Sequence, residues 1–166
     1  NKKTYQELIY EMVEMDYRKN PYELILNEGN FRFSDNFFRA NDLDGNQAVI
    51  GVNTGSGKAF ANKNLRKEKI MQLIRLLDKE LGAKILLLGG PSEKEINNYI
   101  IKNAGCEIID GGCENSLKDF SGLVNRCSAI ITADTLAMHI AIALKRPVVA
   151  LFGPTCSRPP ASTQAI

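Results

Sequence analysis

The sequence predicts an α/β domain with a doubly wound parallel sheet. Short β-branched, apolar runs alternate with longer segments of helical periodicity four times along the chain. These runs are apolar almost throughout, which is typical of strands buried on both faces of a parallel sheet. Because crossovers between parallel strands are right-handed, such a repeat places helices on both sides of the sheet.

The first 47 residues lack this regular alternation. Apolar residues at helical spacing predict a helix over 5–17, and 22–26 is a candidate extended segment. A phenylalanine-rich stretch follows, and NDLDGN at 41–46 is a turn signal. We interpret 1–47 as a linker and helical lead-in from a missing N-terminal domain, packed against the domain that the sequence contains.

The regular part, 48–166, is predicted to be one Rossmann-like domain. Its strands are expected at 48–53, 84–89, 106–110, 129–132 and 147–152. Its helices are expected at 66–81, 92–103, 117–127 and 135–144, with Gly82 closing the first of them.

The composition excludes several classes of protein. The chain of 166 residues has 21 basic and 19 acidic residues, so nothing favours nucleic acid or a strong attraction to membrane surfaces. No apolar run approaches the length of a membrane span. Four cysteines without a CxxC pair, together with a single histidine, predict no zinc site and reduced thiols in a cytoplasmic setting.

The segment 129–155 carries the strongest functional signal. It reads as strand, turn, helix, loop and strand, and its helix is apolar all round except for His139, which predicts burial on most sides. Asp134 is expected at the N-cap, and Thr135 and His139 share a face. Polar groups at the carboxyl end of a strand, beside a helix N-terminus, favour a phosphate-bearing ligand. In a purely structural interpretation, Asp134 only caps the helix and His139 is a satisfied core histidine.

This segment closely resembles the nucleotide-sugar signature of glycosyltransferase family 9, the heptosyltransferase-like enzymes. Asp134, Thr135 and His139 match the family's Asp-Ser/Thr-Gly-x-x-His helix start. Phe152 to Thr155 match its aromatic-Gly-Pro-Ser/Thr turn, whereas Leu136 stands where the family has glycine. The resemblance runs from about residue 48 to residue 155.

The resemblance implies that the chain is the C-terminal, donor-binding half of a GT-B glycosyltransferase. The intact enzyme would move a heptose-like sugar from a nucleotide diphosphate sugar to a lipopolysaccharide or other lipid-linked glycan acceptor. The family needs no metal or other cofactor, and its catalytic base belongs to the N-terminal domain, so the fragment alone should be inactive. The expected location is cytoplasmic, with at most peripheral association at the inner face of the membrane.

The resemblance also implies a set of donor-binding residues. The loop after the first strand supplies Thr54, Gly55 and Ser56, and Lys63, with Lys58 as second choice, would contact the diphosphate. These lysines belong to a basic cluster next to a helix start, whose structural interpretation is a solvated loop. The same set continues around the predicted site with Gly90, Ser92, Glu93, Asn115, Asp134, Thr135, Leu136 and His139.

Several alternatives remain open at this point. Ser92 and Glu95 could form only a capping box. A nucleotide-sugar epimerase of GT-B architecture would need further acid–base groups around the sugar. A non-catalytic nucleotide-binding module is supported by Leu136 in place of glycine, and a structural domain would bind no nucleotide.

Overall fold

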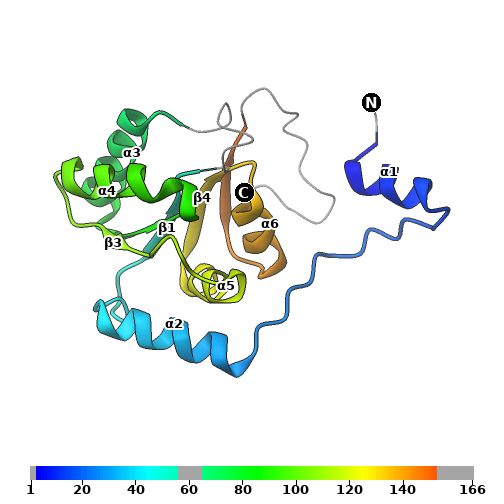
Figure 1. Ribbon diagram of the computed structural model, residues 1–166, viewed down its shortest axis with the longest axis horizontal. Coiled ribbons are helices and arrows are strands. Elements are labelled where there is room, and N and C mark those ends of the chain that lie inside the picture. The colour runs from blue at the N-terminus through cyan, green and yellow to red at the C-terminus, as the bar shows by residue number, and fades with distance from the viewer. Residues whose placement is uncertain (1–2, 56–64, 153–166) are drawn as a thin grey trace.

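A computed structural model describes residues 3–55 and 65–152, which form an α/β domain with a parallel sheet (Figure 1). The strands lie in the order β3-β2-β1-β4-β5, and every neighbouring pair is parallel. They are β1 (Val49–Asn53), β2 (Lys84–Leu88), β3 (Ile109–Asp110), β4 (Ala129–Ala133) and β5 (Val148–Leu151). The predicted doubly wound sheet is confirmed, and its strand order reverses direction between β1 and β4.

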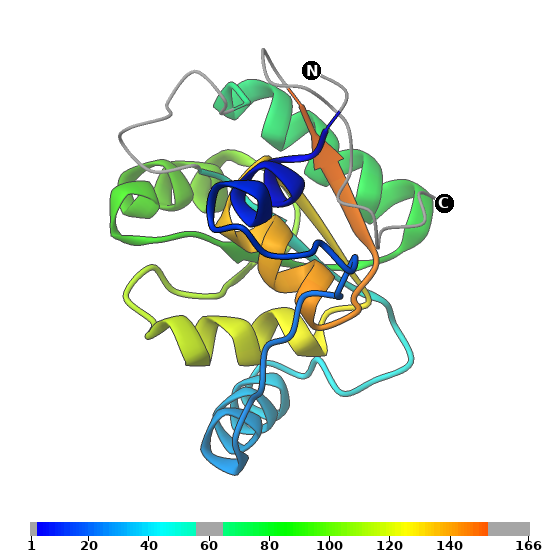
Figure 2. The same ribbon diagram turned by 90° about the vertical axis from the view of Figure 1, so that its right-hand side faces the viewer.

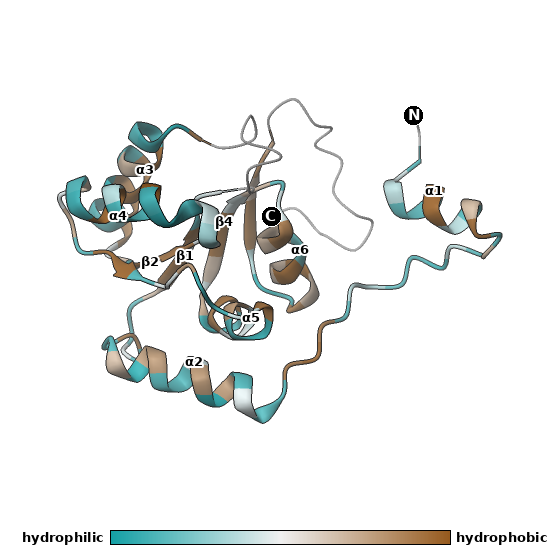
Figure 3. Cartoon of the chain, in the orientation of Figure 1, coloured by the Kyte–Doolittle hydropathy of each residue, from teal (hydrophilic) through white to brown (hydrophobic). Residues whose placement is uncertain are grey.

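The central strands are buried because helices cover both faces of the sheet. Alternate side chains of β2 point to opposite faces, so Leu86 and Leu88 join one hydrophobic cluster while Ile85 and Leu87 join the other. Figure 3 shows this as brown strands between helices that carry teal residues. The near-continuous apolar character of the strands follows from this double coverage.

Two helices pack on each face. On one face, α3 (Lys67–Leu81) and α4 (Lys94–Asn103) contribute Ile70, Ile74 and Ile100. On the other, α5 (Leu117–Arg126) and α6 (Leu136–Ala143) contribute Leu123, Val124 and Ile140. The predicted boundaries of these helices hold to within two residues.

The main error of the sequence analysis is the missed helix α2 (Glu28–Ala40). It forms an outer layer against α5 (Figure 1) and buries Asn30, Ser34 and Phe38, four residues apart. Asn27 begins it with a capping box to Asn30, over hydrogen bonds of 3.1 Å in both directions. The lead-in therefore contributes to the core of the domain.

The other two elements predicted in the lead-in also differ from the structure. Helix α1 (Tyr5–Met12) ends five residues before the predicted end and buries none of its residues. Residues 22–26 are not a strand, although Tyr22, Leu24 and Leu26 are half-buried in alternation and Leu24 packs against the core. In Figure 2 this connection crosses the view in front of α6.

Two local predictions at strand ends are wrong. Strand β3 begins three residues later than expected. The segment after β2 begins with a short 3₁₀ turn, η2 (Pro91–Glu93), so Ser92 does not cap the following helix. Within 3–55 and 65–152, no helix is long and apolar enough to cross a membrane.

Candidate functional site

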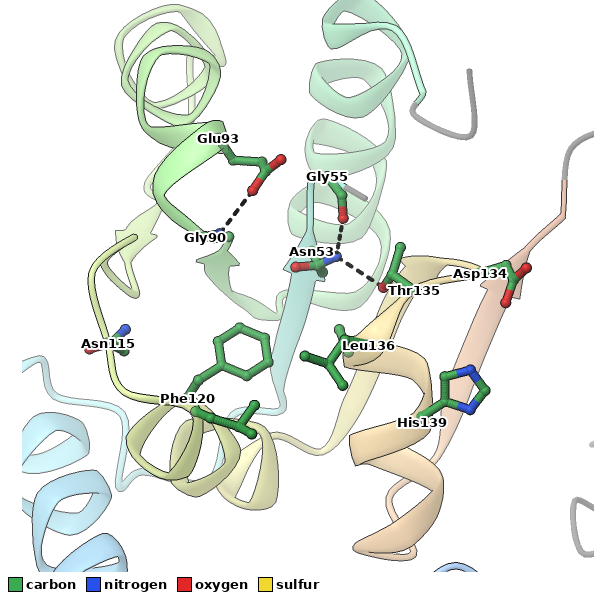
Figure 4. Close-up of a pocket in the computed structure, with 13 residues that line it drawn as sticks. Asn53, Gly55, Gly90, Glu93, Asn115, Phe120, Asp134, Thr135, Leu136 and His139 are labelled. Atoms are coloured by element: carbon green, nitrogen blue, oxygen red, sulfur yellow. Dashed lines mark hydrogen bonds between the residues drawn. The ribbon is translucent and has the colours of Figure 1, made fainter. Parts of the chain in front are cut away.

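A cavity of about 730 Å³ opens at the carboxyl ends of the strands, at the switch point between β1 and β4 (Figure 4). Open parallel sheets bind ligands at this position, and the volume suits a small molecule. The cavity is lined by Asn53, Gly55, Gly89, Gly90, Glu93, Asn115, Leu117, Phe120, Asp134, Thr135, Leu136, Ala137 and His139.

The base of the cavity is a hydrogen-bond cluster centred on Asn53, the last residue of β1. Its amide nitrogen donates to the carbonyl oxygen of Gly55 at 2.8 Å and lies 3.2 Å from Thr132 Oγ1 and 3.4 Å from Thr135 Oγ1. The hydroxyls of Thr132 and Thr135 are 2.9 Å apart. This cluster ties the loop after β1 to the start of α6.

One wall of the cavity is the N-terminus of α6. Thr135, and not Asp134 as predicted, is the N-cap, with extended angles of φ −140° and ψ 176°. No side chain in the described part of the chain caps this turn, and the Thr135 carbonyl accepts from Met138 N at 3.1 Å. Such a helix end presents backbone N–H groups and a positive dipole to an anion.

Helix α6 is less buried than its composition predicts. Ala137, Met138, Ile140 and Ala141 face the core, but the Leu136 side chain is 60% exposed. In Figure 4 Leu136 points from the helix start towards Phe120 on α5, across the cavity. Leu136, Leu117 and Phe120 thereby give this side of the cavity an apolar surface.

His139 is exposed, so the interpretation as a core histidine is wrong. Its ring meets Tyr22 of the lead-in edge to face, with centroids 5.7 Å apart and planes at 90°. Partial burial raises the pKa of the Tyr22 phenol, whose oxygen accepts a hydrogen bond from Gln6. Asp134 and His139 lie on the side of α6 that faces away from Phe120 (Figure 4).

The opposite wall comes from the loops after β2 and β3. The Glu93 carboxylate is buried and accepts a hydrogen bond from Gly90 N at 3.0 Å. A Cβ at Gly55 would collide with this carboxylate, so the glycine allows the two loops to approach. Asn115 closes the loop after β3 by donating to the Gly111 carbonyl at 2.7 Å.

The cavity brings together eight of the predicted site residues: Gly55, Gly90, Glu93, Asn115, Asp134, Thr135, Leu136 and His139. Thr54 is buried and Ser92 is exposed, and neither of them lines the cavity. Ser56, Lys58 and Lys63 lie outside the described residues, as do Gly153, Pro154 and Thr155.

Two lining residues that the geometry makes prominent, Asn53 and Phe120, were not predicted from the sequence. A polar residue that ends a buried strand was the available signal for Asn53. Phe120 falls near the start of a predicted helix, but its position opposite Leu136 depends on how α5 and α6 pack (Figure 4). The described residues contain no group of three His, Cys, Asp or Glu side chains that could hold a metal ion.

The fold and the cavity define a Rossmann-like α/β domain with a cavity at its topological switch point. The sequence profile of glycosyltransferase family 9 (heptosyltransferase) matches residues 3–165, so the chain belongs to this family. The match includes the lead-in and is wider than the expected 48–155.

Individual relatives agree with this assignment. Lipopolysaccharide heptosyltransferase 2 of Escherichia coli (strain K12) is 30% identical over 151 residues, or 86% of this chain and 41% of that protein. A family 9 glycosyl transferase from Veillonella parvula DSM 2008 superposes with a TM-score of 0.75 at 25% identity, over 81% of this chain and 38% of that chain. The E. coli ADP-heptose lps heptosyltransferase II superposes with a TM-score of 0.67 at 26% identity, over 81% and 40%. The chain thus spans about two fifths of the length of these relatives.

Proposed function

We propose that this chain is the donor-binding half of a glycosyltransferase that moves a heptose-like sugar from a nucleotide diphosphate sugar to a lipopolysaccharide or other glycan acceptor. The observation that supports this most is the cavity between the start of α6, where no side chain of the described residues forms a cap, and the Glu93 carboxylate. Its two sides suit the two ends of such a donor, since the helix start favours a diphosphate and a carboxylate can accept from ribose hydroxyls.

In this proposal the diphosphate lies at the start of α6. The Asn53 amide supplies hydrogen bonds to both threonine hydroxyls. Either hydroxyl can donate in their 2.9 Å contact, and we assign Thr132 as the donor. A hydroxyl has one proton to donate, and that of Thr135 is then left for a phosphate oxygen. Asp134 orients the sugar on the other side of the helix start.

The leaving nucleotide diphosphate gains negative charge as the sugar departs. His139, in the first turn of α6, and Lys63, assigned from the family resemblance alone, offset this charge. The catalytic base belongs to the N-terminal part of the intact protein, and transfer needs no metal ion. We expect the intact enzyme to act in the cytoplasm, at most peripherally associated with the membrane that holds its acceptor.

Calorimetric titration of this chain with ADP, UDP and GDP tests the proposal. ADP is the first candidate because one relative is the E. coli ADP-heptose lps heptosyltransferase II. We expect one diphosphate to bind, and His139→Ala to weaken this binding while unfolding remains cooperative. Binding of none of the three by a folded chain would contradict a donor site within it.

The control is His139→Gln, which keeps a hydrogen-bond donor but cannot become cationic. If His139 acts by its charge, both variants weaken binding alike. If it acts by a hydrogen bond, the glutamine variant keeps most of the affinity.

A further inference from the structure

Asn97 is a polar side chain buried outside the cavity wall. It lies in α4 and is 1% exposed. Burying an amide is unfavourable unless its hydrogen bonds are satisfied, so its partners explain why it is there.

Those partners come from two different loops. The Thr54 hydroxyl, at the end of β1, donates to Asn97 Oδ1 over 2.5 Å. The Asn97 amide nitrogen donates to Cys113 Sγ, in the loop after β3, over 3.5 Å. Because one end of the amide accepts and the other donates, neither Asp nor Leu reproduces both contacts.

The loop after β2 approaches the Asn97 side chain closely at Gly89. A Cβ at Gly89 would lie 2.9 Å from both Asn97 Nδ2 and Glu93 Cβ, which is too close for any other residue. Asn97 therefore touches all three loops that carry Gly55, Glu93 and Asn115 to the cavity.

We propose that Asn97 is a positioning residue of the donor site, which sets the spacing of the loops after β1, β2 and β3 on the nucleoside side of the cavity. This inference rests on the proposed function but concerns a residue that does not line the cavity. The buried amide of Asn97 thereby controls the contacts of three loops around the proposed nucleoside pocket.

The test compares Asn97→Leu with Ile100→Ala in this chain. Leucine has the same number and branching of side-chain heavy atoms as Asn97 but makes neither hydrogen bond, whereas Ile100→Ala removes apolar packing from the next turn of the same buried face. Amide hydrogen exchange at residues 54–55, 89–90 and 113–115 is measured together with the affinity for ADP, UDP and GDP.

We expect Asn97→Leu to speed exchange in all three loops and to weaken binding of the preferred diphosphate by about fivefold or more. Ile100→Ala should lower Tm and leave exchange in the three loops close to that of the rest of the domain. The proposal would be overturned if amide exchange in the three loops were no faster in Asn97→Leu than in Ile100→Ala. It would also be overturned if the wild type bound a diphosphate and Asn97→Leu bound it with the same affinity.

A second comparison separates positioning from general destabilisation. Since Asn97 acts on the β1 loop through the Thr54 hydroxyl, Asn97→Leu should add little to exchange at residues 54–55 in a Thr54→Val background, whereas exchange at 113–115 should still rise because the Cys113 contact is lost. An additive rise at 54–55 would contradict the mechanism. Absence of binding by the wild-type chain would count against the proposed function itself, and the exchange data would then decide on Asn97 alone.

Discussion

The Asn53 side chain joins the end of β1 to the start of α6, with its amide nitrogen 3.4 Å from the Thr135 hydroxyl. The two residues lie 82 positions apart in sequence and belong to the strand and the helix on either side of the topological switch. The same amide donates to Gly55, so it fixes two parts of the candidate diphosphate site at once.

Asn53→Ala is therefore expected to weaken diphosphate binding by roughly tenfold, the equivalent of about one net hydrogen bond. The reason is that both the Gly55 loop and the Thr135 hydroxyl lose their common donor. Calorimetric titration measures the effect. The control is Asn103→Ala, whose amide also donates to a backbone carbonyl, at 2.7 Å, but on the exposed surface of α4. Equal effects in the two variants would contradict the role of Asn53.

Leu136→Gly should strengthen diphosphate binding. Leu136 is the first residue of α6, and its exposed side chain projects into the cavity where a smaller residue would let a ligand approach the backbone. The gain should appear for ADP and be absent for adenosine, because it concerns the phosphates. Tyr5→Gly is the matched control, since Tyr5 is the first residue of α1, is 76% exposed and does not line the cavity. A gain for adenosine as well would show that Leu136 acts on the nucleoside instead.

The sheet could be predicted from the sequence because each strand and helix carries its own periodicity. Helix α2 was missed for the opposite reason: Phe31 and Phe33 interrupt the pattern of 30, 34 and 38 that its buried face follows. Only the position of α5 shows which of these faces is covered.

The candidate site was predictable where one short segment carries it, as in Asp134, Thr135 and His139. The roles of Asn53 and Asn97 were not, because their partners lie 82 and 43 residues away in sequence. The N-cap was assigned to Asp134 since aspartate is a common cap, but the turn after β4 places Thr135 there.

Phe38→Ala should destabilise the domain by about 3–5 kcal/mol, the usual cost of removing a buried phenylalanine side chain. Phe38 lies in α2, is 1% exposed and belongs to the core cluster of α5 and α6. Urea unfolding measures the change. Phe31→Ala is the control, because Phe31 lies in the same helix but is 42% exposed and should cost little. A small change in the free energy of unfolding for Phe38→Ala would mean that the lead-in contributes little to the stability of the domain.

Burial of the Cys127 thiol predicts a loss of stability at alkaline pH. Burial raises the pKa of Cys127 to about 12 from an ordinary 9.0, because the thiolate would lose its hydration. Between these values the folded chain binds more protons than the unfolded one, so the free energy of unfolding falls as pH rises. The contribution is complete below pH 9 and declines by up to about 1.4 kcal/mol per pH unit above it.

Urea unfolding of the wild type and of Cys127→Ala at pH 8 and pH 10.5, under reducing conditions, isolates this contribution. At pH 8 the wild type should be the more stable, since the thiol fills space next to Leu123 and Gly51. At pH 10.5 its advantage should shrink by about 2 kcal/mol, because only the wild type carries the thiol that must stay protonated. Cys106 and Cys113 are present in both proteins, so their own raised pKa values cancel in the comparison. An advantage that stays constant between the two pH values would mean that the Cys127 thiol ionises as easily in the folded chain as in the unfolded one.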